Sequence, residues 1–177
     1  MYKNLNLSHN FRNIKPPRRG REIVSYGEWV DGQFYGLCYY EVKDKDITAR
    51  AFAYLPPQLR EAYLLRYLVI TYPHIPPHTD SHTYSCINFY IDTADARTTF
   101  WKNPKNIEGY QVSNQVDGRT YHSEDLTAVD SFVARSGESW ALDIKSIHSV
   151  DYQSEGRRTA LTLTSMEVKY DELISYF

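Results

Sequence analysis

The sequence predicts a mainly β protein in which short antiparallel strands form a sandwich or barrel. Three observations favour this class. Apolar residues alternate with a period of two rather than 3.6, β-rich runs recur at short intervals with turn residues between them, and the 16 tyrosines suit packing in strands. A length of 177 residues fits one domain over residues 1–177, with enough chain to bury a substantial core.

The first elements are expected to be a hairpin and then a helix. Residues 22–30 and 33–42 are rich in Tyr, Val, Ile and Phe, and Asp31-Gly32 between them is a strong signal for a tight turn. From Pro56 to Arg66, two prolines precede a run of good helix formers. This pattern predicts a helix outside the sheets. We expect one or two such flanking helices in all.

Seven further β-rich runs follow this predicted helix. They are residues 67–72, 84–91, 98–102, 129–134, 139–144, 148–152 and 158–168. Between the third and fourth runs lies the polar segment 103–127, which contains Gly109 and Asp117-Gly118. It is long for a structureless connection, and we therefore predict that it is a lid or an insertion.

Alternation along two of these runs predicts which face of each strand lines a site. In the second run all odd positions except Ser85 are apolar, whereas the even positions include the polar Asn88 and two tyrosines. In the last run Leu161 and Leu163 share one face, and Arg158 shares the other with small polar residues. If the second faces look into one cavity, His78, Asp80 and Arg158 meet there.

Metal-ligating residue types occur in an informative order. His78-Thr79-Asp80 supplies an imidazole and a carboxylate, His148 begins a later β-rich run, and Arg158 follows in the next. Two imidazoles and one carboxylate on one face of a metal leave the opposite positions open, as non-haem Fe(II) oxygenases require. Roughly one H-x-D/E pattern is expected by chance in a chain of this length and composition. Most of the support for a metal site therefore comes from the downstream residues His148 and Arg158.

These positions resemble the motif of the 2-oxoglutarate and Fe(II)-dependent dioxygenase superfamily, in particular of its compact prolyl-hydroxylase-like members. The similarity covers residues 67–168. It implies a double-stranded β-helix, that is, a jelly-roll or cupin-like barrel. It also implies that His78, Asp80 and His148 hold Fe(II), that 2-oxoglutarate and O2 are co-substrates, and that the enzyme hydroxylates a substrate with release of succinate and CO2.

The same resemblance gives a second group of residues to the keto acid. Arg158 would bind its far carboxylate, because a guanidinium fork can donate two parallel charge-assisted hydrogen bonds. Arg157 would point to the other face of the strand, and Arg97 is the competing arginine. Tyr72 and Asn88, on strands flanking the first ligands, would donate hydrogen bonds to the co-substrate.

Each proposed ligand also has a structural alternative. His78 and Asp80 could form a solvated turn pair, His148 could cap a strand, and Arg158 could be a surface ion-pair partner. His82 would share a strand face with His78, so a cupin-type metalloenzyme with four ligands and no keto acid is a second hypothesis. A non-catalytic jelly-roll binding module is a third.

Charge and cysteine content limit the partners and the compartment. With 20 basic and 22 acidic residues the net charge is −2, which argues against a nucleic acid and leaves a small molecule or a peptide as the expected substrate. Cys38 and Cys86 lie in apolar surroundings without metal-binding spacing, so we expect two buried thiols and a reducing, cytoplasmic location. The sequence predicts neither an apolar leader nor a membrane-spanning stretch.

Overall fold

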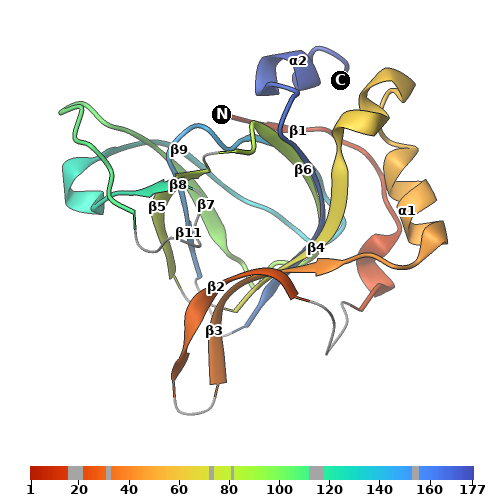
Figure 1. Ribbon diagram of the computed structural model, residues 1–177, viewed down its shortest axis with the longest axis horizontal. Helices are drawn as coiled ribbons and strands as arrows, with labels where there is room; N and C mark the ends of the chain where they lie inside the picture. The colour runs from red at the N-terminus through yellow and green to blue at the C-terminus, as the bar shows by residue number, and fades with distance from the viewer. Residues whose placement is uncertain (16–21, 31–32, 72–73, 81, 112–117, 153–155) are drawn as a thin grey trace.

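The computed structural model consists mainly of two antiparallel β-sheets that face each other (Figure 1). It describes residues 1–15, 22–30, 33–71, 74–80, 82–111, 118–152 and 156–177, and the side chains of residues 22–30 and 33–35 lie outside that description. The seven-stranded sheet has the order β1-β10-β6-β12-β4-β3-β2, and the five-stranded sheet has the order β8-β5-β11-β7-β9.

The elements have the following bounds. The strands are β1 Tyr2–Asn4, β2 Glu22–Val30, β3 Gln33–Glu41, β4 Leu64–Ile70, β5 His74–Asp80, β6 Ser85–Asp92, β7 Arg97–Lys102, β8 Gly118–Thr120, β9 Thr127–Val133, β10 Ser139–Asp143, β11 His148–Asp151 and β12 Arg158–Ser165. The α-helices are α1 Lys45–Phe52 and α2 Tyr170–Ile174, and the 3-10 helices are η1 Phe11–Asn13, η2 Pro57–Ala62 and η3 Ser123–Asp125.

From β4 onward the chain crosses back and forth between the two sheets. Strands β4, β6, β10 and β12 lie in the larger sheet, whereas β5, β7, β9 and β11 lie in the smaller one. Strands that are distant in sequence therefore pair within a sheet, as β4 does with β12 and β5 with β11. This is the topology of a jelly roll, and the predicted fold class is confirmed.

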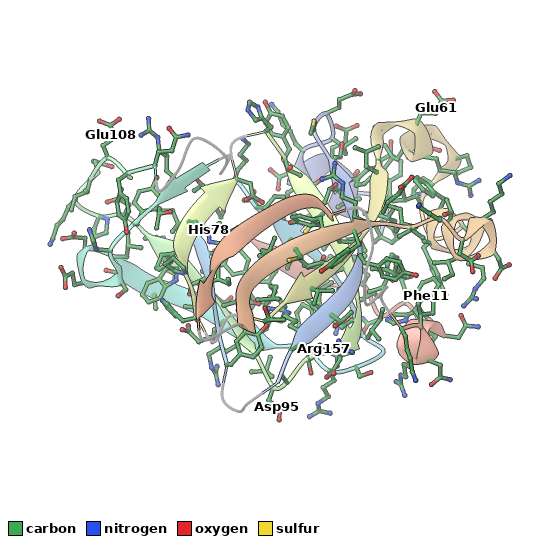
Figure 2. The ribbon with its side chains drawn as sticks, turned by 60° about the horizontal axis from the view of Figure 1, so that its bottom comes forward. Phe11, Glu61, His78, Asp95, Glu108 and Arg157 are labelled. Carbon is green, nitrogen blue, oxygen red and sulfur yellow. The ribbon has the colours of Figure 1, made fainter. Side chains whose placement is uncertain are left out.

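The larger sheet separates two apolar clusters. On its outer face Leu161 of β12 and Ile87 of β6, both fully buried, pack with Phe11, which is labelled in Figure 2. On its inner face, toward the smaller sheet, Ala160 and Tyr90 belong to the second cluster. Successive residues of one strand thus serve opposite faces, and the predicted alternation along β6 and β12 is confirmed.

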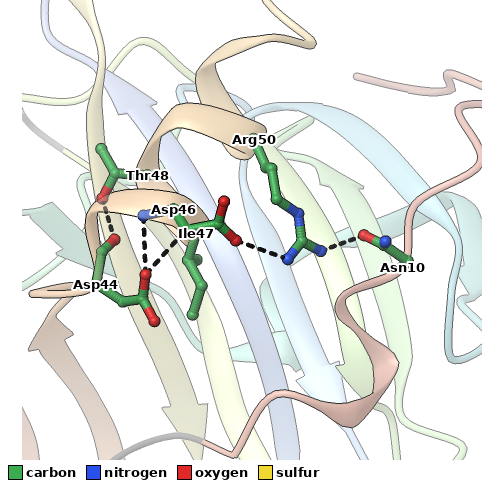
Figure 3. Close-up of polar contacts among 6 residues, drawn as sticks. All are labelled: Asn10, Asp44, Asp46, Ile47, Thr48 and Arg50. Atoms are coloured by element: carbon green, nitrogen blue, oxygen red, sulfur yellow. Dashed lines mark hydrogen bonds and ion pairs between the residues drawn. The ribbon is translucent and has the colours of Figure 1, made fainter.

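Helix α1 covers the outer face of the larger sheet (Figure 1). Its N-terminus is capped by Asp44, whose carboxylate accepts hydrogen bonds from the N–H groups of Asp46 and Ile47 (Figure 3). Arg50 donates hydrogen bonds to the carboxylate of Asp46 and to the side-chain oxygen of Asn10 (Figure 3). The helix is therefore fixed both to the sheet and to the N-terminal segment.

The prediction of a helix from Pro56 to Arg66 is wrong. Its first half is the 3-10 helix η2, and Leu64 already begins β4. β4 pairs along its whole length with β12 and becomes fully buried toward its C-terminal end. Ladder hydrogen bonds and burial therefore outweigh the helix propensity of leucine and arginine here. The flanking α-helices are instead α1 and α2, which the sequence prediction missed.

Strand β5 is the most important element that the sequence prediction missed. Its central residues are Pro76 and Pro77, and prolines argue against a strand because they donate no ladder hydrogen bond. The pairing of β5 with β11 shifts register between His148 and Val150, so a bulge lies beside these prolines. The motif His78-Thr79-Asp80 therefore forms the last three residues of a paired strand and does not lie in a turn.

The seven predicted β-rich runs all correspond to strands, with ends displaced by a few residues. The first hairpin is also present as β2 and β3, although the turn residues Asp31 and Gly32 lie outside the described residues. Within the segment 103–127, β8 pairs with β5 and extends the smaller sheet at the cavity. The role of this segment as a lid stays a prediction.

Candidate functional site

A cavity of about 300 Å³ lies between the inner faces of the two sheets. The smaller sheet contributes His78 and Asp80 from β5 and His148 from β11. The larger sheet contributes Asn88 from β6 and Arg158 from β12. Five predicted site residues from four strands thus line one cavity, and the sixth, Tyr72, lies outside the described residues.

The two imidazoles are paired across neighbouring strands. His78 and His148 are directly opposite each other in the β5–β11 ladder, and their ring centroids are 4.3 Å apart. Nδ1 of His78 donates to the carbonyl oxygen of Pro76 at 2.8 Å, and Nδ1 of His148 donates to that of Ser146 at 2.9 Å. Because a carbonyl can only accept, each ring carries a proton on Nδ1, and in the neutral form of each ring the lone pair that could bind a metal is on Nε2.

Asp80 lies on the same face of β5 as His78, since the two residues are separated by one position. Its backbone is held firmly: its N–H donates to the carbonyl of Ile144 at 3.1 Å, and its carbonyl accepts from Nζ of Lys145 at 3.0 Å. Burial and then the negative charge of Asp80 raise the pKa of the Cys86 thiol, a residue of the opposite cavity wall. The carboxylate therefore acts on the interior of the cavity.

The three predicted metal ligands do not form a closed ligand set. Across the described ranges of the chain, no three His, Cys, Asp or Glu side chains gather closely enough to constitute a metal site. The two imidazoles lie side by side, and a site with three protein ligands would also need the carboxylate of Asp80, which lines the same cavity. Two neutral imidazoles and one carboxylate nevertheless make up the donor set of non-haem Fe(II) oxygenases, so the residues fit this ion.

Arg158 is buried on the opposite wall of the cavity, with 2% of its surface exposed. Its Nη1 donates to the hydroxyl of Thr98 at 2.8 Å, and its Nη2 donates to the hydroxyl of Tyr90. The guanidinium carbon also lies 4.6 Å from the centroid of the Tyr90 ring. These contacts fix the orientation of the guanidinium but supply no negative charge.

The charge of Arg158 has no counter-ion within the described part of the chain, where no carboxylate lies within 4.0 Å of its guanidinium. Its Nε and the Oδ1 atom of Asn88 are both buried without a hydrogen-bond partner there. A buried cation is costly unless an anion accompanies it. The cavity is thus complementary to a ligand that brings a carboxylate to Arg158 and a hydrogen-bond donor to Asn88.

The predicted role of Asn88 changes in detail. Its Nδ2 already donates to the hydroxyl of Tyr90 at 3.3 Å, so the atom that remains is the acceptor Oδ1. Sequence reasoning also missed Thr98, which lines the cavity and holds Arg158. Alternation could not have identified it, because Thr98, Thr99 and Phe100 are buried in succession along β7.

The competing residues have other positions. Arg97 is exposed and donates to the hydroxyl of Ser131 at 3.0 Å, and Arg157 is also exposed beside the buried Arg158. His74, at the far end of β5, forms an ion pair with Asp151. His82 is exposed but lines the cavity, so it stays a possible further ligand.

The first prediction from this site concerns pH. Burial, then the neighbouring charges of His78 and Arg158, lowers the pKa of His148 from 6.5 to about 3. The unfolded chain therefore binds a proton that the metal-free folded protein does not, and stability should fall as the pH drops below 6.5, by up to about 1.4 kcal/mol per pH unit. Urea denaturation between pH 6.5 and 5 measures this slope. His148→Asn should flatten it, and equal slopes in the two proteins would contradict the prediction.

The second prediction concerns Gly118, which lies opposite Asp80 in the β5–β8 ladder. Its φ is +141°, and a Cβ there would lie 1.8 Å from the carbonyl oxygen of Thr79. Gly118→Ala should therefore push β8 away from β5 and lower the free energy of unfolding by roughly 1–3 kcal/mol. Urea denaturation measures the loss. Arg119→Ala, an exposed change on the same strand, is the control and should cost much less.

Comparison with known proteins leaves the family open. No family model and no curated protein matches this sequence. Among the described residues, no helix has the length and apolar character needed to cross a membrane. Cys38 and Cys86 are both buried and do not form a disulfide, as predicted.

Several solved structures are similar to this chain at low sequence identity. The epimerase SnoN from nogalamycin biosynthesis, in complex with Fe3+, alpha ketoglutarate and nogalamycin RO, is 12% identical with a TM-score of 0.49, over 80% of this chain and 67% of that one. Vicilin from hazelnut, Corylus avellana, is 12% identical with a TM-score of 0.44, over 81% and 31%. L-ribose isomerase from Cellulomonas parahominis, with L-ribose, is 14% identical with a TM-score of 0.38, over 75% and 61%.

The chain thus spans about a third of the vicilin chain and about two thirds of the epimerase chain. At such identities and TM-scores these similarities do not indicate an activity.

Proposed function

We propose that this protein is an Fe(II)- and 2-oxoglutarate-dependent dioxygenase that hydroxylates an organic substrate. The observation that carries the proposal is the pairing of two groups in one cavity. A buried, uncompensated guanidinium, Arg158, lies on one wall, and two imidazoles with free Nε2 atoms, His78 and His148, lie on the other. A keto acid that chelates a metal at one end and carries a carboxylate at the other satisfies both groups.

Each residue then has a definite task. His78, His148 and Asp80 would hold Fe(II), and Arg158 would bind the far carboxylate of 2-oxoglutarate by charge-assisted hydrogen bonds. When bound, the iron and the keto acid supply the oxidising chemistry, with release of succinate and CO2. The chain orients these groups and excludes water, since most of the cavity wall is apolar, with Leu68, Ile70 and other aliphatic side chains.

Partner and compartment are part of the proposal. We propose a small molecule or a peptide as the substrate, because the net charge of −2 gives no basis for binding a phosphate backbone. The buried cysteines Cys38 and Cys86, which form no disulfide with each other, are consistent with a reducing cytoplasm.

The test is an anaerobic titration with Fe(II) and then 2-oxoglutarate, followed by visible absorption. The proposal expects a charge-transfer band that needs both components and that His82→Ala retains. Fe(II) binding without this band would exclude the keto acid. Loss of metal in His82→Ala would favour the cupin-type alternative, since His82 lines the same cavity. A protein that retains no iron would favour a non-catalytic binding module.

A further inference from the structure

A second arginine lines the cavity at a distance from Arg158. Arg66 lies on β4 opposite Thr162 of β12, whereas Arg158 is opposite Ile70. Four residues of strand separate the two arginines along the sheet, which corresponds to about 13 Å between their backbones. One carboxylate therefore cannot satisfy both, and Arg66 is left over when the keto acid is bound at Arg158.

Arg66 is oriented but not neutralised. Its guanidinium carbon lies 5.7 Å from the centroid of the Tyr39 ring, a cation–π contact with another residue of the cavity wall. Glu41 is its cross-strand neighbour on β3, yet within the described residues no carboxylate approaches its guanidinium to 4.0 Å. The side chain is half-buried, so part of its hydration has already been lost.

Three exposed apolar side chains continue this cavity wall beyond Arg66. Leu64, Tyr84 and Met166 are 51%, 37% and 54% exposed. Leu64 has the same strand parity as Arg66, and Thr164, which lines the cavity, is opposite Leu64 in the β4–β12 ladder. Met166 lines the cavity itself, and Tyr84 comes directly before β6, with its N–H donating to the carbonyl of Ser165. Leu64 begins β4, Met166 directly follows β12 and Tyr84 directly precedes β6, and these three strands are neighbours in the larger sheet. We call the three residues the apolar rim.

From this combination we infer the class of the primary substrate, an inference that rests on the proposed function. The geometry points to an organic acid with an apolar body, whose carboxylate pairs with Arg66 while its apolar part lies on the apolar rim. Arg66 is then a specificity-determining residue. An acid would gain a charge-assisted ion pair that its neutral amide cannot form, whereas both would gain the same apolar contact.

The test compares acids with their matched amides. Protein loaded with Zn(II) in place of Fe(II), with saturating 2-oxoglutarate, is titrated calorimetrically with 4-phenylbutyrate, octanoate and N-acetylphenylalanine, and with the carboxamide of each. Because the keto acid occupies Arg158, the probes report on the remaining cavity. We expect at least one acid to bind about 10-fold more tightly than its amide, a modest factor because Arg66 is partly exposed.

Two variants identify the residue responsible. Arg66→Gln should reduce the affinity for the acid to that for the amide, and Arg66→Lys should retain part of the preference. Arg97→Gln, an arginine on a strand but outside the cavity, is the matched control and should keep the full preference. The inference is overturned if no acid binds more tightly than its amide, or if the preference survives Arg66→Gln.

The charge-transfer band separates this inference from the proposed function. Arg66→Gln should retain the band with Fe(II) and 2-oxoglutarate. If the unmodified protein lacks the band, the proposed function fails. If the band forms but acids show no preference, only the substrate inference fails. If Arg66→Gln abolishes the band, Arg66 serves the keto acid and the inference is wrong.

Discussion

Replacing Arg158 by methionine is expected to raise the Kd for 2-oxoglutarate by about 100-fold. Methionine fills a similar volume but donates no hydrogen bond to a carboxylate, and the loss of a charge-assisted bidentate contact corresponds to about 3 kcal/mol. Titrating the anaerobic Fe(II) protein with 2-oxoglutarate and following the visible band measures the effect. The Kd for Fe(II) should stay nearly unchanged, because Arg158 lies on the wall opposite the imidazoles.

Arg157→Met is the matched control, since the neighbouring side chain is exposed and should not affect the keto acid. The stability of the metal-free protein offers a second check. Methionine removes a buried charge that has no counter-ion among the described residues, so unfolding should not become much easier. An unchanged Kd for 2-oxoglutarate in Arg158→Met would show that the keto acid binds elsewhere or not at all.

Replacing His148 by alanine is expected to raise the Kd for Fe(II) by about 100-fold or more. Changes to residues that merely orient metal ligands already cost about 10- to 100-fold in affinity, and removal of a direct ligand costs at least as much. The neighbouring imidazole of His78 and the carboxylate of Asp80 would remain, so weak binding should persist. Equilibrium dialysis against Fe(II) under anaerobic conditions measures the change.

His74→Ala provides the control for this experiment. His74 lies on β5, like His78, but it forms an ion pair with Asp151 of β11 at the other end of the strand. Fe(II) affinity should be unaffected. If His148→Ala bound iron as tightly as the unmodified protein, His148 would not be a ligand and the iron would bind elsewhere.

The sequence predicts the strands well because their period-two alternation is a direct consequence of packing between two faces. Leu161 and Leu163 lie in the outer cluster and Arg158 lines the cavity, as their alternation along β12 predicts. Local propensity failed where long-range pairing decided the outcome. The chain after Ala62 becomes a strand because β12 pairs with it, and β5 tolerates two prolines because a bulge in its pairing lies beside them.

For the site, sequence reasoning identifies side chains but not their partners. His78, Asp80, His148 and Arg158 meet at one cavity as expected, because strand order and parity follow from the fold. Thr98 and Tyr90 hold Arg158, but both are distant from it in sequence, so the sequence alone does not reveal these contacts. The orientation of Asp80 relative to the imidazoles depends on rotamers, which no sequence pattern specifies.

Side chains of β6 and β12 point alternately to the outer core and to the cavity, and this separation suggests how substrate selectivity can be changed. Outward side chains such as Leu161 maintain the core, while inward ones such as Thr162 and Thr164 touch the cavity without belonging to either apolar cluster. A library randomised at the two threonines should therefore change which molecules are accepted while most variants still fold. Engineering of this barrel can begin from those positions.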